Sequence, residues 1–154
     1  MITIIRTNSA NQDFRELITY LDEDLAIRDG SEHAFYAQFN KVDMINHVVI
    51  AYDDNRPVGC GSIKKLTSDS MEVKRMYTAP ASRGKGIAST VLRELERWSA
   101  ELSYKKCILE TGNKQPEAIA LYFKSGYKVV QNYGQYAGVE NSICFEKELG
   151  GICE

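Results

Sequence analysis

The segment at residues 83–88 has the composition of an anion-binding turn. It stands between a predicted strand and a predicted helix, and its residues are Arg83, Gly84, Lys85, Gly86, Ile87 and Ala88. Glycine lets the backbone adopt positive φ and approach a ligand closely. Backbone N–H groups at the start of a helix bind phosphate, and the two cationic side chains add charge. The segment therefore predicts a phosphate or pyrophosphate site, although two glycines also suit a simple tight turn.

The spacing of these glycines separates the segment from two common nucleotide sites. A P-loop reads G-x-x-x-x-G-K-[ST], and a dinucleotide-binding turn reads G-x-G-x-x-G. Residues 83–88 and their neighbours match neither pattern. A Rossmann-type dinucleotide site is therefore disfavoured, and nucleotide binding without group transfer stays an alternative.

With its flanks, the turn resembles the acetyl-CoA motif of the GNAT superfamily of N-acetyltransferases. That motif, Q/R-x-x-G-x-G/A, is matched by Arg83, Gly86 and Ala88. Residues 73–80 resemble the family's fourth strand and the proline after it, and residues 109–127 resemble its C-terminal half. The resemblance spans residues 45–149 and is closest to small single-domain bacterial members. Residues 7–45, where such enzymes build acceptor specificity, match only in outline.

The resemblance implies one acyl-CoA N-acyltransferase domain over residues 1–154. Its fold would be α/β, with a mixed, mostly antiparallel central sheet of about seven strands flanked by about four helices. The fourth and fifth strands would splay apart. Acetyl-CoA would be the co-substrate, and the reaction would need no metal.

The resemblance also assigns residues to the co-substrate. Amides of residues 83–88 would hold the CoA pyrophosphate. The fourth-strand backbone at Met76, Tyr77 and Thr78 would pair with pantetheine, and an N–H there would polarise the thioester carbonyl. Asn113 would contact the CoA arm, and the Tyr122 hydroxyl would lie near the thioester sulfur.

Acetylation of an amine requires a base and an acid. An alkyl amine with a pKa near 10.4 is mostly protonated at neutral pH, so it must lose a proton before it attacks a thioester. Glu72 stands where the resemblance places this base, with Glu110 as the rival. Tyr122 would donate a proton to the departing thiolate. Each side chain also has a structural interpretation, as a solvated strand residue for Glu72 and as core for Tyr122.

The acceptor pocket is the least specified part of the site. Arg75, Glu110 and Tyr136 are expected to line it, although surface or packing roles fit Arg75 and Tyr136 equally well. We expect the acceptor to be a primary amine of a small molecule. Acetylation of a protein lysine or N-terminus, and a non-catalytic acyl-CoA sensor, remain alternatives.

The elements that must position these residues follow from hydrophobic periodicity. A strand at residues 2–6 precedes a helix whose apolar face runs from Phe14 to Leu25, with Asn11 or Asp13 as its cap. A weaker helix is expected within residues 29–45. An antiparallel meander then covers residues 47–78. The remaining expected elements are a helix at 87–102, a strand at 106–110, a helix from Pro116 to before Gly126, and strands at 127–133 and 142–147.

Length and charge limit the function classes. The chain has 154 residues, 19 basic against 21 acidic side chains, and a formal net charge of −2. Nucleic-acid-binding domains are usually strongly basic, so no nucleic-acid partner is expected. No apolar run approaches the length of a membrane span, so no membrane partner is expected either. Four scattered cysteines and two histidines predict reduced thiols, no metal site and a cytoplasmic location. A homodimer is possible, because such enzymes often dimerise.

Overall fold

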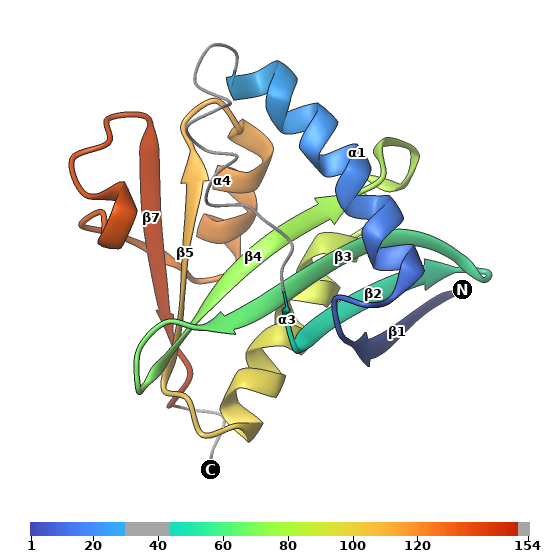
Figure 1. The fold of residues 1–154 in the computed structure, drawn as a ribbon, viewed down its shortest axis with the longest axis horizontal. Coiled ribbons are helices and arrows are strands. Elements are labelled where there is room, and N and C mark those ends of the chain that lie inside the picture. Colours follow the sequence, from blue (N-terminus) through green and yellow to red (C-terminus); the bar gives the residue numbers. More distant parts are fainter. Residues whose placement is uncertain (30–43, 151–154) are drawn as a thin grey trace.

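A seven-stranded sheet organises the protein, and its strands lie in the order β1-β2-β3-β4-β5-β7-β6 (Figure 1). The computed structural model describes residues 1–29 and 44–150. All neighbouring strands are antiparallel except β4 and β5, which are parallel. The predicted mixed, mostly antiparallel sheet is confirmed. The strands are β1 (Ile2–Thr7), β2 (His47–Asp53), β3 (Arg56–Lys65), β4 (Ser70–Thr78), β5 (Lys106–Gly112), β6 (Lys128–Val130) and β7 (Ser142–Glu148).

Three α-helices flank the sheet within the described residues. They are α1 (Gln12–Asp29), α3 (Ile87–Glu101) and α4 (Pro116–Lys124), and short 3₁₀ turns lie at Pro80–Ser82 and Gly134–Tyr136. The weaker helix expected within residues 29–45 falls largely on residues 30–43, outside the described part of the chain. Asn11 is the cap of α1, because its Oδ1 accepts the N–H of Phe14 at 3.1 Å.

One predicted strand proves shorter than expected. The strand expected over residues 127–133 is reduced to Lys128–Val130. The Asn132 amide donates to the carbonyls of Val139 and Ser142, at 3.0 and 3.1 Å, and this holds the following chain in a loop. Residues 131–141 therefore form a lobe beside β7 instead of extending the ladder (Figure 1).

Two buried clusters show that α1 and α3 cover opposite faces of the sheet. In Figure 1, α1 crosses in front of β2, β3 and β4, and α3 runs behind them. Phe14, Leu17 and Leu21 of α1 pack with Val48, Ile50 and Cys60. Apolar residues of α3, with Val91, Leu92 and Leu95 buried, pack on Val49, Met71 and Val73. The alternation of Val48, Val49 and Ile50 between these clusters is the two-residue period of a strand buried on both faces.

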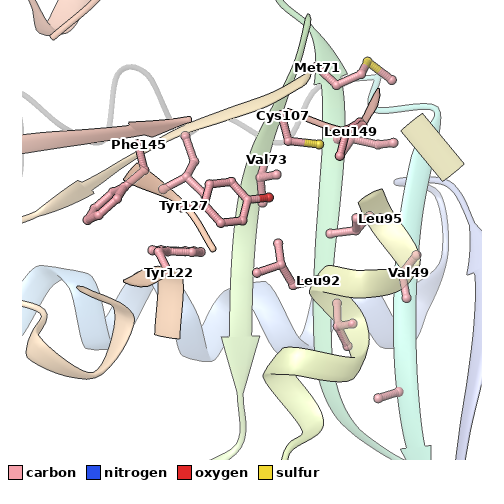
Figure 2. Close-up of a cluster of buried hydrophobic side chains, with 14 of the residues drawn as sticks. Val49, Met71, Val73, Leu92, Leu95, Cys107, Tyr122, Tyr127, Phe145 and Leu149 are labelled. Atoms are coloured by element: carbon pink, nitrogen blue, oxygen red, sulfur yellow. The ribbon is translucent and has the colours of Figure 1, made fainter. Parts of the chain in front are cut away.

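The second cluster reaches α4 and β7. Figure 2 shows Tyr122 of α4 beside Tyr127 and Phe145, with Leu92 and Val73 close by. The Tyr122 ring centroid lies 5.8 Å from that of Tyr127 and 5.7 Å from that of Phe145. These tilted contacts are favourable geometries for aromatic pairs. The interpretation of Tyr122 as a core residue therefore holds for its ring. None of the described helices is long and apolar enough to cross a membrane.

Candidate active site

A cleft opens at the centre of the sheet, where β4 and β5 separate. The two strands pair only from Ser70 opposite Lys106 to Glu72 opposite Ile108, and then diverge (Figure 1). A cavity of about 520 Å³ occupies this region, and residues of β4, β5, α1, α3 and α4 line it. Parallel strands that separate leave backbone N–H and C=O groups available for a ligand. The expected splay of the fourth and fifth strands is confirmed.

A β-bulge in β4 decides which side chains face each side of the sheet. Cys60 of β3 lies opposite Tyr77, and Ser62 lies opposite Lys74, so Arg75 and Met76 together oppose Gly61. Arg75 has φ of 59°, a left-handed conformation that is uncommon for a side chain of its size.

The carbonyl groups at this bulge are hydrogen-bonded from β3. The Ser62 hydroxyl donates to the Lys74 carbonyl at 2.8 Å, and the Cys60 thiol donates to the Arg75 carbonyl at 3.5 Å. Side-chain bonds thus take over where the regular ladder is interrupted. The bulge is therefore an ordered feature of β4.

The predicted anion site lies at the N-terminus of α3. Gly84 and Gly86 both have φ of 79°, and a Cβ on either would meet no atom within 4 Å. Both positions therefore need glycine for backbone conformation and leave open space in front of the turn. Gly86 is the N-cap of α3, so the N–H groups of the first helical turn point out beside it.

Glu72 lines the cleft and accepts a hydrogen bond from a segment near the C-terminus of the chain. Its side chain is 7% exposed, and its Oε2 accepts a hydrogen bond of 2.7 Å from the Tyr133 hydroxyl. Burial, then the charge of Glu72, raises the pKa of Tyr133, so this phenol keeps its proton. Such a charge-assisted bond fixes the orientation of the carboxylate.

Glu110 lines the same cleft from β5. Its Oε2 accepts a hydrogen bond of 2.7 Å from the Ser142 hydroxyl. The pKa of Tyr136, which also lines the cleft, is raised by burial and then by the charges of Glu110 and Glu72. Both candidate bases and Tyr136 are therefore brought together, and geometry leaves Glu72 and Glu110 both within the site.

Tyr122 combines a core position with a place in the cleft lining. Burial, with a smaller contribution from the charge of Glu110, raises the pKa of its hydroxyl above the ordinary value near 10. A phenol in this state is protonated throughout the neutral range. This hydroxyl can donate a hydrogen bond, and its role in proton transfer stays a prediction.

The remaining expected residues divide into two groups. Nine line the cleft, namely Arg75, Met76, Tyr77, Thr78, Arg83, Gly84, Gly86, Ile87 and Ala88. Lys85 and Asn113 do not line it and are exposed. The Asn113 amide instead donates to Asn141 Oδ1 at 3.3 Å, and its backbone N–H donates to the Asn141 carbonyl.

Within the glycine turn, the side chains of Arg83 and Ile87 contact other parts of the protein, which leaves the backbone for a ligand. Arg83 folds back, since its Nε donates to the Thr78 carbonyl at 2.9 Å and its guanidinium lies over the Tyr77 ring. The Ile87 side chain is buried in the core, so only its backbone can serve a ligand. The turn therefore presents mainly backbone amides to a ligand, and the exposed Lys85 side chain adds a positive charge beside them.

Sequence reasoning missed Tyr133 and Ser142, the two hydroxyl donors that hold the carboxylates. Both lie in or beside the lobe at residues 131–141, far along the chain from Glu72. The sequence around Tyr133 is rich in tyrosine, but its spacing does not predict a contact with β4. Only the strand order, which places β7 next to β5, brings this lobe to the cleft.

Comparison with known sequences assigns a family. A sequence profile of the acetyltransferase (GNAT) family matches residues 11–127. The chain is 30% identical over 152 residues to the IAA acetyltransferase of Azospirillum brasilense, covering 96% of this chain and 98% of that protein. It is 40% identical over 83 residues to the uncharacterized N-acetyltransferase YjgM of Escherichia coli, a match that spans about half the length of each chain.

Solved structures share the fold over nearly the whole length. A proposed acyl-CoA N-acyltransferase from Klebsiella pneumoniae superimposes with a TM-score of 0.81 at 27% identity, covering 97% of this chain and 98% of that one. The PaiA N-acetyltransferase of Thermoplasma acidophilum, solved in complex with coenzyme A, gives 0.71 at 19% identity, covering 96% and 99%. The second likeness is one of fold alone.

Proposed function

Because the chain belongs to the acetyltransferase (GNAT) family, we propose that it transfers an acetyl group from acetyl-CoA to a primary amine of a small molecule. One observation carries this proposal. A single cleft collects the glycine turn, the separated edges of β4 and β5, two carboxylates and a protonated phenol. These are the groups that acyl transfer from a thioester to an amine requires.

The cleft fits acetyl-CoA by the chemistry of its donors. The open turn at Gly84 and Gly86 would hold the pyrophosphate with backbone amides, and Lys85 would add charge at the rim. The β4 backbone from Met76 to Thr78, which has no partner on the β5 side, would pair with the pantetheine arm. The coenzyme A complex of the PaiA protein, which shares this fold, supports this assignment.

Glu72 is proposed as the base that takes the amine proton, directly or through a water. Its support is the bond from Tyr133, which fixes one carboxylate oxygen and leaves the other for the incoming amine. Glu110 is the second candidate, since it lines the same cleft and is held by Ser142. Tyr122 is proposed to return a proton to the departing thiolate, supported by its place in the cleft lining, where its hydroxyl is protonated at neutral pH.

The enclosure of the cleft favours a small acceptor. Acetyl-CoA would fill part of the cavity of about 520 Å³, which leaves limited room for the acceptor beside the thioester. Leu21, Asp24 and Leu25 of α1 close one side of this cavity. Acetylation of a protein amine is the second candidate, but no observation favours it.

Location and assembly stay predictions. Cys60, Cys107 and Cys144 are buried free thiols, which supports a reducing compartment such as the cytoplasm. Homodimerisation rests on the resemblance to other family members.

The test is thiol release from acetyl-CoA with a panel of amines, comparing wild type with Glu72→Gln, Glu110→Gln and Tyr122→Phe. General acid–base groups typically contribute about 10²–10⁴-fold, so the true base variant should lose at least 100-fold in kcat. Calorimetry with CoA supplies the matched binding measurement, and all variants should keep CoA affinity. Failure of the wild type to bind CoA would refute the proposal. Binding without turnover on any amine would favour the sensor alternative.

A further inference from the structure

Arg75 is a buried cation in the wall of the cleft. Its side chain is only 2% exposed, and its Nη2 donates to Asp22 Oδ1 of α1 at 2.8 Å. Asp22 itself is 52% exposed, so water screens its charge. Within the described part of the chain, this half-solvated partner compensates the charge of the guanidinium only in part.

Two donors of the Arg75 guanidinium lack a hydrogen-bond partner in the part of the chain that the structure describes. Among the described residues, neither Nε nor Nη1 of Arg75 is hydrogen-bonded, although both atoms are buried. A buried donor without an acceptor keeps its full desolvation penalty, and a charged donor keeps a larger one. No other buried side-chain nitrogen or oxygen in the described part of the chain is left in this state. Unsatisfied groups of this kind are rare in native structures and need a reason.

The bulge in β4 places this cation beside the proposed base. Met71 and Val73 face the cluster under α3, so Glu72 between them faces the α1 side. The bulge at Arg75 and Met76 then returns Met76 to the α3 side and leaves Arg75 on the α1 side with Glu72. Both line the cleft. A regular strand would place residues three apart on opposite faces.

The other charged groups that line the cleft carry both signs. Asp24, Glu72, Glu110 and Glu117 are acidic, and Lys74, Arg83 and Lys124 are basic. On β4, Glu72 would attract a cationic amine, whereas the unpaired donors of Arg75 would attract an anion. A molecule that carries both charges satisfies both sets of groups.

We propose that the acceptor is an amino carboxylate, whose amine meets Glu72 and whose carboxylate accepts hydrogen bonds from the free donors of Arg75. This rests on the proposed function and names its substrate class. Hydrogen bonds between a guanidinium and a carboxylate are among the strong ones in proteins, and the unpaired donors of Arg75 lie buried in the lining of the cleft.

Matched substrates test the proposal on the unaltered enzyme. Each amino acid is compared with its primary amide and with its decarboxylated amine, for example phenylalanine, phenylalaninamide and phenethylamine. A charge-assisted hydrogen bond of about 1.5–3 kcal/mol corresponds to roughly a 10–100-fold preference in kcat/KM for the carboxylate. Equal or lower kcat/KM for the carboxylates across the panel would overturn the proposal, while turnover of the amines would leave the proposed function intact.

Arg75 variants then tie the preference to this side chain. In Arg75→Gln the ratio of kcat/KM for acid over amide should fall at least tenfold, and Arg75→Lys should restore part of it. The ratio is measured within one variant, so a general loss of stability does not change it. A ratio that survives in Arg75→Gln would overturn the assignment. Should this variant not fold, the wild-type panel alone decides. Acetylation of no amine at all would instead refute the proposed function.

Discussion

The Tyr133 hydroxyl donates a 2.7 Å hydrogen bond to the Glu72 carboxylate, joining the lobe at residues 131–141 to strand β4. The two residues are 61 positions apart in the chain. Glu72 lies at the last position where β4 and β5 pair, and the hydrogen bond from Tyr133 fixes the orientation of its carboxylate. A carboxylate held in this way keeps one oxygen for chemistry without having to be reoriented.

We expect Tyr133→Phe to lower kcat about tenfold while the affinity for CoA stays unchanged, because the phenyl ring keeps its packing but releases Glu72. In a Glu72→Gln background the same change should cost little more, since residues in one network are not additive. Steady-state kinetics on the double-mutant cycle measures this coupling. Tyr52→Phe removes a comparable bond, from Tyr52 to Asp13 at 2.6 Å, and serves as the control. Additive losses would contradict a positioning role.

The glycine turn offers a second matched pair. Gly86→Ala should destabilise the fold by about 1 kcal/mol because φ of 79° is costly for alanine, and it should also weaken CoA binding. Gly126 has φ of 93° at the end of α4, and it does not line the cleft. Gly126→Ala should therefore cost similar stability and leave CoA affinity unchanged. Chemical denaturation and calorimetry separate the two effects, and equal affinities in both variants would count against the phosphate site.

Stability should fall as the pH rises above about 10. Burial raises the pKa of Tyr122, Tyr127 and Tyr133 in the folded protein, whereas unfolded tyrosines ionise near pH 10. Above that pH the unfolded state binds fewer protons than the folded state, so the free energy of unfolding decreases with pH. Below it these groups are neutral in both states and contribute no pH dependence. Urea unfolding between pH 8 and 11.5, with tyrosinate absorbance, checks this; constant stability across the range would contradict it.

A buried network links α3 to the C-terminal strands. Glu96 is 4% exposed, and it accepts bonds of 2.9 Å from both the Tyr127 hydroxyl and the Lys147 ammonium. Glu96→Ala should cost about 3–5 kcal/mol, because it leaves a buried hydroxyl and a cation without their acceptor. Glu94→Ala on the same helix breaks more exposed ion pairs and should cost about 1 kcal/mol or less. Thermal or urea unfolding of the two variants compares these costs; similar losses would contradict the distinction.

Local sequence determined those parts of the site that depend on neighbours in the chain. The turn at Gly84 and Gly86 was predictable because its backbone conformation requires glycine. The buried faces of α1 and α3 were predictable from helical spacing. The splay of the fourth and fifth strands followed from a resemblance, since composition and periodicity reach only the class of mixed α/β sheet. The hydrogen bond from the Asn113 amide to Asn141 was not predictable in this way, because the two residues lie in different segments of the chain.

Only the tertiary structure decided which charged groups face one another. The bulge at Arg75 shifts the alternation of β4, and this depends on pairing with β3 and on the Ser62 and Cys60 bonds. The partners of Glu72 and Glu110 come from a lobe that reaches the cleft through the β5–β7 pairing. Spacing along the chain carries no such information, because contacts between distant segments arise from strand order and from the desolvation of groups that meet only in the folded state.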